Sequence, residues 1–208
     1  MMRFTTMKTK LRKYPSIFLI LLLAISSCFL TGCVNQHPKD SKKISQGESV
    51  ETMLEITDPK EKQAVLNAKA KVKALSGNPR IVATSPAVAD ICDKLDLDLV
   101  GVPKSSVSKI PSRYKKVKKV GLAMSPDMEI VSSLNPDWIL APSSLETDLK
   151  PKFEELKNTE YAFLNLRSVQ GMYRSVQELG EIFGKQQEGE KMTKEFTTFY
   201  KSYTKRNK

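Results

Sequence analysis

The chain contains 208 residues, of which 40% are hydrophobic and 27% are charged. This composition is typical of a globular protein with room for one domain, and it excludes collagen-like, low-complexity and wholly disordered chains. Lys and Arg outnumber Asp and Glu by 34 to 23, which gives a formal net charge of +11. Such a charge can indicate a nucleic acid partner, so the position of the basic residues decides how it is interpreted.

The first 33 residues have the pattern of an export signal. Basic residues gather in the first thirteen positions, and an apolar run follows over residues 14–30 and leads into Thr31, Gly32 and Cys33. The run is short for a membrane span, which needs about 20 apolar residues. The sequence LTGC resembles the bacterial lipobox. We therefore expect a lipoprotein signal peptide over residues 1–32 and lipidation at Cys33; the alternative is a buried thiol at the end of a membrane anchor.

Removal of residues 1–32 changes both the charge and the location of the protein. Five basic and no acidic residues leave with the signal, so the net charge falls from +11 to +6 and we expect no nucleic acid partner. Acyl chains on Cys33 would anchor the mature chain to the extracellular face of the cell membrane. Cys92 then stays as the one free thiol, and its place in an apparent helix favours a small core residue over a reactive thiol.

Residues 33–78 precede the domain and are mostly polar. The stretch 34–49 has no aromatic residue, and it contains the only histidine, His37, which nothing nearby organises as a metal ligand. Asp58-Pro59 has the pattern of a helix start, with proline in the first turn. The sequence predicts a polar and partly helical tether over residues 33–78, and it leaves open whether the helix packs on the domain.

From residue 79 to residue 184 the chain alternates short apolar runs with helical patterns. Strands are expected at 81–83, 99–102, 138–141 and 161–164, and helices at 86–95, 127–134, 146–156 and 169–183. Strands that alternate with helices favour an α/β fold, with a parallel sheet flanked by helices.

Two of these helices begin with a hydroxyl residue before proline. Ser85 precedes Pro86, and Ser125 precedes Pro126, so both serines are predicted N-caps. Helix starts of this kind lie at the carboxyl edge of a parallel sheet, where ligands bind in open α/β folds. Pro86 has no backbone N–H, so Ala87 and Val88 would supply any backbone donors there.

Two segments carry a resemblance to a known family. Residues 80–102, RIVATSPAVADICDKLDLDLVGV, and residues 121–142, GLAMSPDMEIVSSLNPDWILAP, resemble the amino-terminal lobe of periplasmic-binding-protein-like proteins. The resemblance runs from Arg80 to the C-terminus. It implies a membrane-anchored solute-binding lipoprotein of a Gram-positive bacterium, with an ABC permease as partner and no enzymatic activity. It also implies that residues 185–208 begin the helix between two lobes, and that the second lobe is missing.

Within this family, haem-binding members are the most similar, and they imply a set of site residues. A methionine of theirs coordinates haem iron from the position of Met124, and Pro86, Ala87, Ser105 and Ser106 fall where such proteins contact haem. Ser106 stands where a tyrosine is expected. A thioether can serve as an axial haem ligand, whereas the alternative for Met124 is a core-filling side chain. The resemblance further implies haem as the transported ligand and cell-surface haem-relay proteins as possible partners.

Other functions stay open at this point. The transported ligand could instead be an iron-siderophore or cobalamin, and a truncated chain could have lost its function. The basic run 113–119 interleaves charge with an aromatic residue and could bind a polyanion, although a solvated face is the simpler interpretation. The family docks on its permease through surface carboxylates, for which Glu129 and Glu146 are candidates. The sequence contains none of the common metal-binding, phosphate-binding or nucleophile motifs.

Overall fold

The computed structural model describes residue 54 and residues 56–206, which belong to one compact unit. The predicted signal peptide over residues 1–32, the lipidation site Cys33 and His37 all lie outside the described residues. Within the described part of the chain, no helix is both long enough and apolar enough to cross a membrane.

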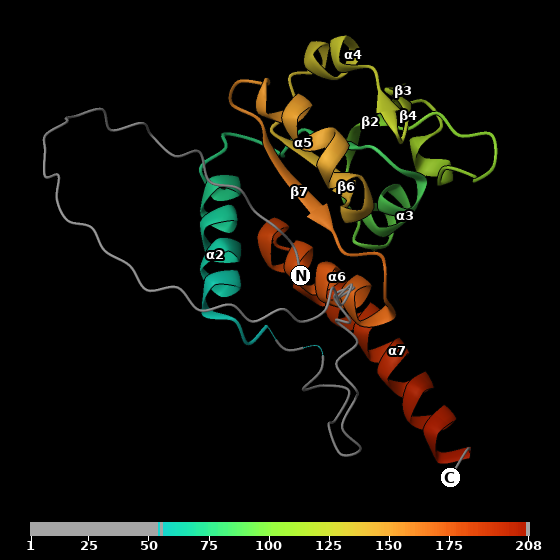
Figure 1. Ribbon diagram of the computed structural model, residues 1–208. Coiled ribbons are helices and arrows are strands. Elements are labelled where there is room, and N and C mark those ends of the chain that lie inside the picture. Colours follow the sequence, from blue (N-terminus) through green and yellow to red (C-terminus); the bar gives the residue numbers. More distant parts are fainter. Residues whose placement is uncertain (1–53, 55, 207–208) are drawn as a thin grey trace, which may run out of the picture. The chain divides into compact units, whose positions relative to one another are not determined.

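A five-stranded parallel sheet forms the centre of this unit (Figure 1). Its strand order is β3-β2-β1-β6-β7, with the bounds β1 Ile81–Ala83, β2 Leu99–Val102, β3 Lys118–Lys119, β6 Trp138–Pro142 and β7 Glu160–Leu164. The helices are α2 Pro59–Lys73, α3 Pro86–Lys94, α4 Met128–Ser133, α5 Glu146–Glu154, α6 Val169–Phe183 and α7 Gln186–Arg206. The predicted α/β fold with a parallel sheet flanked by helices is confirmed.

Side chains alternate between the two faces of the sheet, because successive residues of a strand point to opposite sides. On one face, residues of β1, β2, β6 and β7 pack with α2, α3 and α6 in a cluster that includes Ile81, Leu140 and Leu179. On the other face, Val82 and Ile139 pack with α4 and α5. Both faces of the sheet are therefore covered, as a parallel sheet requires.

Helix α2 packs on α6, which settles what the sequence leaves open about the segment before the domain. Val65 and Ala68 of α2 are buried in the first core cluster. Arg174 of α6 donates a hydrogen bond to Glu61 of α2 at 2.6 Å, and both side chains are largely buried. Residues 59–73 are thus a packed helix of the same unit rather than a solvated spacer.

The two predicted N-caps have different outcomes. Ser85 caps α3, since its Oγ accepts a hydrogen bond from the N–H of Val88. Ser125 does not cap α4, and this prediction is wrong. Asp127 is the cap, because its carboxylate accepts from the N–H groups of residues 129 and 130. Ser125 and Pro126 instead form strand β5 of a small hairpin.

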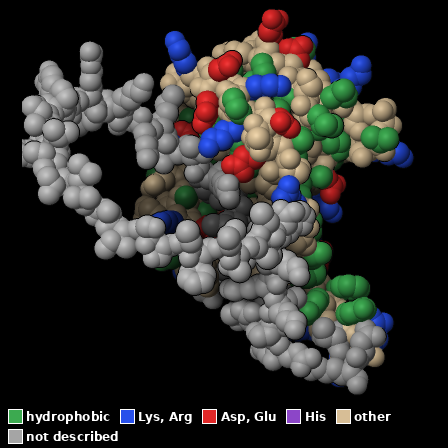
Figure 2. Space-filling view, viewed as in Figure 1, with side chains coloured by type: hydrophobic (Ala, Val, Ile, Leu, Met, Phe, Trp, Pro, Cys, Tyr) green, Lys and Arg blue, Asp and Glu red, His purple; other side chains and the backbone are tan. Residues whose placement is uncertain are grey.

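Helix α7 carries aromatic side chains both against α6 and on the surface. Phe196 stacks on Tyr173 of α6 with ring centroids 4.4 Å apart. Phe199 and Tyr203 are exposed, and Figure 2 shows hydrophobic side chains on the surface along this helix. The prediction of a helix over residues 185–208 is confirmed by α7 within the described residues.

Candidate ligand-binding site

The carboxyl edge of the sheet is where the fold places a ligand. Along the chain the strands step from β1 to β2 and β3 on one side, and then return to β6 and β7 on the other. The connections that follow β1 and β6 therefore lead to opposite sides of the sheet. In open α/β sheets the ligand crevice lies between two such strands. The loops after β1 and β2 and the hairpin after β3 all lie at this edge.

The loop after β1 contains the first pair of predicted site residues. Pro86 is half-buried and Ala87 is exposed, at the first turn of α3. The N–H of Val88 donates to Ser85 Oγ at 3.3 Å, so it is already occupied by the cap. The expectation that Val88 supplies a free backbone donor is therefore wrong. Ala87 offers an apolar contact and a backbone N–H at this turn.

The loop after β2 contains the second pair. Ser105 is half-buried and Ser106 is exposed. Ser105 Oγ accepts a hydrogen bond from the N–H of Ser108 at 3.0 Å, which leaves the hydroxyl proton available to a ligand. The N–H of Lys104 donates to the carbonyl of Gly121 at 2.7 Å, so this loop is joined to the hairpin that follows β3.

Met124 lies in the hairpin formed by β4 Gly121–Leu122 and β5 Ser125–Pro126. Its side chain is 73% exposed, and that of Leu122 is 59% exposed, so Met124 is not a core-filling residue. Hydrophobic side chains gather on the side of the molecule where β3 and β4 lie (Figure 2). Gly121 has a φ of +97°, a conformation that favours glycine and sets the sharp entry to this hairpin.

This edge offers apolar contacts, hydroxyl donors and one soft ligand. A thioether binds haem iron without first losing a proton, and it suits soft metal centres. Among the described residues there is no group of three or more His, Cys, Asp or Glu side chains that could hold a metal ion by itself. A polar hollow of about 540 Å³ lies at the opposite end of the strands, around Asn135 and Asn158, and away from all predicted site residues.

The two carboxylates predicted to face a permease lie at helix starts. Glu129 is in the first turn of α4 and is exposed, whereas Glu146 is the first residue of α5 and is half-buried. Both are within reach of a partner protein that approaches the ligand edge, because α4 and α5 begin at the carboxyl ends of their strands.

The basic run 113–119 is not an open face of charges and aromatic rings. Arg113 forms ion pairs with three aspartates, and Tyr114 is buried with its hydroxyl donating to the carbonyl of Leu97. Lys118 and Lys119 form strand β3. Tyr114 is therefore no part of an exposed basic and aromatic face, whereas Lys115, Lys116 and Lys118 are exposed, as a solvated face requires.

Cys92 lies in α3 and is completely buried, as predicted. Burial in apolar surroundings raises the pKa of its thiol to about 12, so the thiol stays protonated and unreactive at neutral pH.

A family model for periplasmic binding proteins matches residues 81–208, more than half of the chain. The chain belongs to this family. The haem uptake system protein IsdE of Staphylococcus aureus strain Newman is 35% identical over 117 residues, which cover 56% of this chain and 39% of IsdE. The chain thus spans about two fifths of the length of this curated relative.

Two solved structures of such binding proteins share the fold. An ABC transporter substrate-binding protein from Listeria monocytogenes EGD-e is 43% identical, with a TM-score of 0.56 over 59% of this chain and 46% of that one. The structure of S. aureus IsdE with haem is 33% identical, with a TM-score of 0.55 and the same coverage. Membership of a family of binding proteins confirms that the chain is not an enzyme.

Proposed function

We propose that the protein is a solute-binding lipoprotein of an ABC importer and that it binds haem for delivery to the permease. Membership of the periplasmic binding protein family supports the binding role, and the relative IsdE, named for haem uptake, supports the ligand. The observation that carries the proposal is the exposure of Met124 at the ligand edge, where a methionine has no packing role.

Each group at this edge has a part in the proposed complex. Met124 supplies its sulfur as one axial ligand of the haem iron, and the apolar surfaces of Leu122 and Ala87 contact the porphyrin. The hydroxyl protons of Ser105 and Ser106 are donors for the haem propionates. Because Ser106 offers no aromatic ring, we expect the porphyrin to be held mainly by aliphatic contacts and iron ligation.

The location follows from the amino-terminal segment. Lipidation at Cys33, after removal of residues 1–32, anchors the protein to the extracellular face of the membrane. Glu129 and Glu146 are the proposed contacts to the permease, and cell-surface haem-relay proteins are the proposed source of haem. An iron-siderophore or cobalamin as the transported ligand is the alternative outcome of the binding test.

The test is a titration of the purified protein with haemin, followed by absorption spectroscopy. Met124→Leu keeps the volume of the side chain and removes the thioether, and Met128→Leu is the matched control in the neighbouring helix. We expect a saturable Soret shift for the parent and for Met128→Leu. Met124→Leu should bind at least about tenfold more weakly, which is the lower end of what a lost metal-site interaction costs. Equal binding by both variants would contradict ligation by Met124.

A further inference from the structure

The loop after β2 carries two lysines around a turn of serines. Residues 104–109 have the sequence KSSVSK, and Ser105 Oγ accepts a hydrogen bond from the N–H of Ser108 at 3.0 Å. This bond closes a turn of four residues, so Lys104 and Lys109 stand on either side of it. Both lysine side chains are exposed. One short segment therefore presents two ammonium groups together with serine hydroxyl groups.

The start of this loop is fixed at the ligand edge. Val102, the last residue of β2, pairs in parallel with Lys119 of β3. Beyond the two strands, the N–H of Lys104 donates to the carbonyl of Gly121 at 2.7 Å. Gly121 begins the hairpin that has Met124 in its turn. Lys104 therefore lies past the carboxyl end of β2 and beside the hairpin that contains Met124.

The segment around the loop is rich in basic residues and lacks acidic ones. Residues 99–126 contain seven Lys and Arg residues and no Asp or Glu. Lys104 and Lys109 form no ion pair with any residue that the structure describes. The next carboxylate along the chain, that of Asp127, accepts hydrogen bonds from the N–H groups of residues 129 and 130. The two ammonium groups are thus available to an anion from outside the protein.

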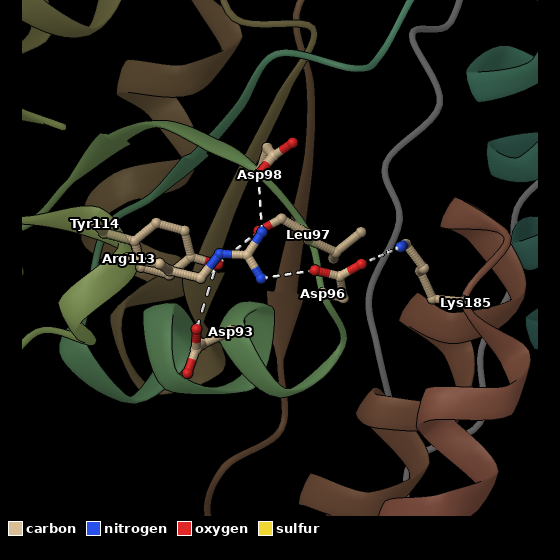
Figure 3. Close-up of polar contacts among 7 residues, drawn as sticks. All are labelled: Asp93, Asp96, Leu97, Asp98, Arg113, Tyr114 and Lys185. Atoms are coloured by element: carbon tan, nitrogen blue, oxygen red, sulfur yellow. Dashed lines mark hydrogen bonds and ion pairs between the residues drawn. The ribbon is translucent and has the colours of Figure 1, made fainter. Parts of the chain in front are cut away.

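Arg113, the next basic residue after this loop, is engaged elsewhere. Its guanidinium forms ion pairs with three aspartates that precede β2, namely Asp93, Asp96 and Asp98 (Figure 3). Hydrogen bonds first from Lys185 and then from Arg113 lower the pKa of Asp96. Because these aspartates come before the first residue of β2, the cluster lies at the amino edge of the sheet. The charge of Arg113 is therefore balanced within the protein and away from the ligand edge.

Haem brings two carboxylates to the ligand edge. Its propionates are ionised at neutral pH, as ordinary carboxyl groups are. None of the contacts proposed above for haem carries a positive charge, and a serine hydroxyl can donate to a carboxylate without balancing its charge. An ammonium group does both, since it has three donors and a full positive charge on a flexible stem.

We propose that Lys104 and Lys109 bind the carboxylates of the ligand, so that the protein selects an anionic porphyrin over a neutral one. This inference rests on the proposed function and adds a second determinant to it. Met124 binds the iron, whereas the two lysines bind the edge of the porphyrin that carries the propionates. Haem with esterified propionates then binds through iron ligation and apolar contacts alone.

The test compares haemin with haemin dimethyl ester, which keeps the iron and the porphyrin and lacks both negative charges. The full chain is titrated with each ligand in one detergent and followed by Soret absorption. The double variant Lys104→Gln/Lys109→Gln should bind haemin roughly threefold to tenfold more weakly, because exposed ion pairs each contribute a modest amount. Its affinity for the ester should equal that of the parent. The loss for haemin should shrink in about 1 M salt, since salt screens exposed charges.

The double variant Lys115→Gln/Lys116→Gln is the matched control. It removes two exposed lysines of the same basic segment, next to Tyr114, whose hydroxyl donates to the carbonyl of Leu97 at the amino edge. Its haemin affinity should be that of the parent.

Three results would overturn the role of the two loop lysines. They are unchanged haemin affinity in Lys104→Gln/Lys109→Gln, an equal loss for haemin and its ester, and an equal loss in the control, which would reveal an effect of net charge alone. If the parent binds neither haemin nor the ester, the proposed function fails and this inference fails with it.

Discussion

Glu178 is the buried carboxyl group that we expect to control how stability depends on pH. It lies on α6, has no exposed surface, and faces Glu61 of α2. Two ionised carboxylates have only acceptors to offer each other, and neither oxygen of Glu178 has a hydrogen-bond partner among the described residues. A protonated Glu178 could donate a hydrogen bond to the Glu61 carboxylate. Burial, and next the neighbouring Glu61, to which a protonated Glu178 can donate a hydrogen bond, raise the pKa of Glu178 to about 8.

The size and sign of the effect follow from this pKa. In the unfolded chain Glu178 loses its proton near its ordinary pKa of 4.5, whereas in the folded protein it keeps the proton until about pH 8. The folded state therefore binds more protons between these values, and the free energy of unfolding falls as pH rises from 4.5 to 8. At about 1.4 kcal/mol for each pKa unit, the full loss is of the order of 5 kcal/mol, as an upper bound.

Urea unfolding followed by circular dichroism at several values between pH 4.5 and 8.5 measures this dependence. Glu178→Gln keeps the shape of the side chain and offers Glu61 an amide donor at every pH. We expect the variant to be more stable than the parent at pH 8. We also expect that its free energy of unfolding does not fall between pH 4.5 and 8. Arg174 stays in both proteins, and so do all groups outside this pair, so their titration cancels in the difference.

Two results would refute this reasoning. The first is a parent protein whose stability is flat or rises between pH 5 and 8. The second is a Glu178→Gln variant whose stability declines with the same slope as that of the parent. The lowered pKa of Asp96 does not disturb the test, because its stabilising contribution is lost only as pH falls below the ordinary value of 3.8.

Gly101→Ala should lower the free energy of unfolding by about 1–3 kcal/mol, because an added Cβ would lie 2.8 Å from a methyl group of Val120 in a packed core. Gly77→Ala, at an open position, should change it by less than about 0.5 kcal/mol, and equal values in urea unfolding would contradict this packing argument. Asp127→Ala should cost about 1 kcal/mol of stability, since it removes the cap of α4, whereas Ser125→Ala should cost almost nothing. A larger loss of stability in Ser125→Ala than in Asp127→Ala would contradict the assignment of Asp127 as the N-cap.

The regular elements could be predicted because their local signals agree with their packing. Residues 169–183 alternate apolar and polar side chains at helical spacing, and α6 has those bounds in the structure. The strands at 81–83 and 99–102 are short apolar runs between turn residues, and both exist as β1 and β2. In these elements the residues that are apolar in the sequence are the residues that pack in the core.

The errors lie where a distant contact decides the local structure. Strand β3 consists of two lysines, and only its pairing with β2 makes it a strand. The Ser125-Pro126 pair has the composition of a helix start, but pairing of β4 with β5 takes these residues into a hairpin and moves the cap to Asp127. The glycine at position 121, which takes a positive φ in the structure, is the sequence feature that could have indicated this hairpin.

Ion pairs and buried charges were the least predictable feature of the fold. Arg113 and Asp96 are 17 positions apart, and nothing in the basic run shows that its first member faces three aspartates. Burial of Glu61 depends in the same way on the docking of α2 against α6, which a polar segment does not reveal. Hydrophobic periodicity can be read from the sequence, whereas ion pairs between distant elements can be read only from the tertiary structure.

Trp138 provides the most direct measurement of the central claim, that this binding protein takes haem as its ligand. It is the only tryptophan, and it is buried at the first residue of β6, at the amino end of that strand. Bound haem quenches tryptophan fluorescence by energy transfer, which does not require contact, so titrations with haemin, a ferric hydroxamate siderophore and cobalamin can be compared on one sample. The account predicts saturable quenching by haemin that the other two ligands do not prevent. Saturable binding of the siderophore or of cobalamin, with none of haemin, would contradict it.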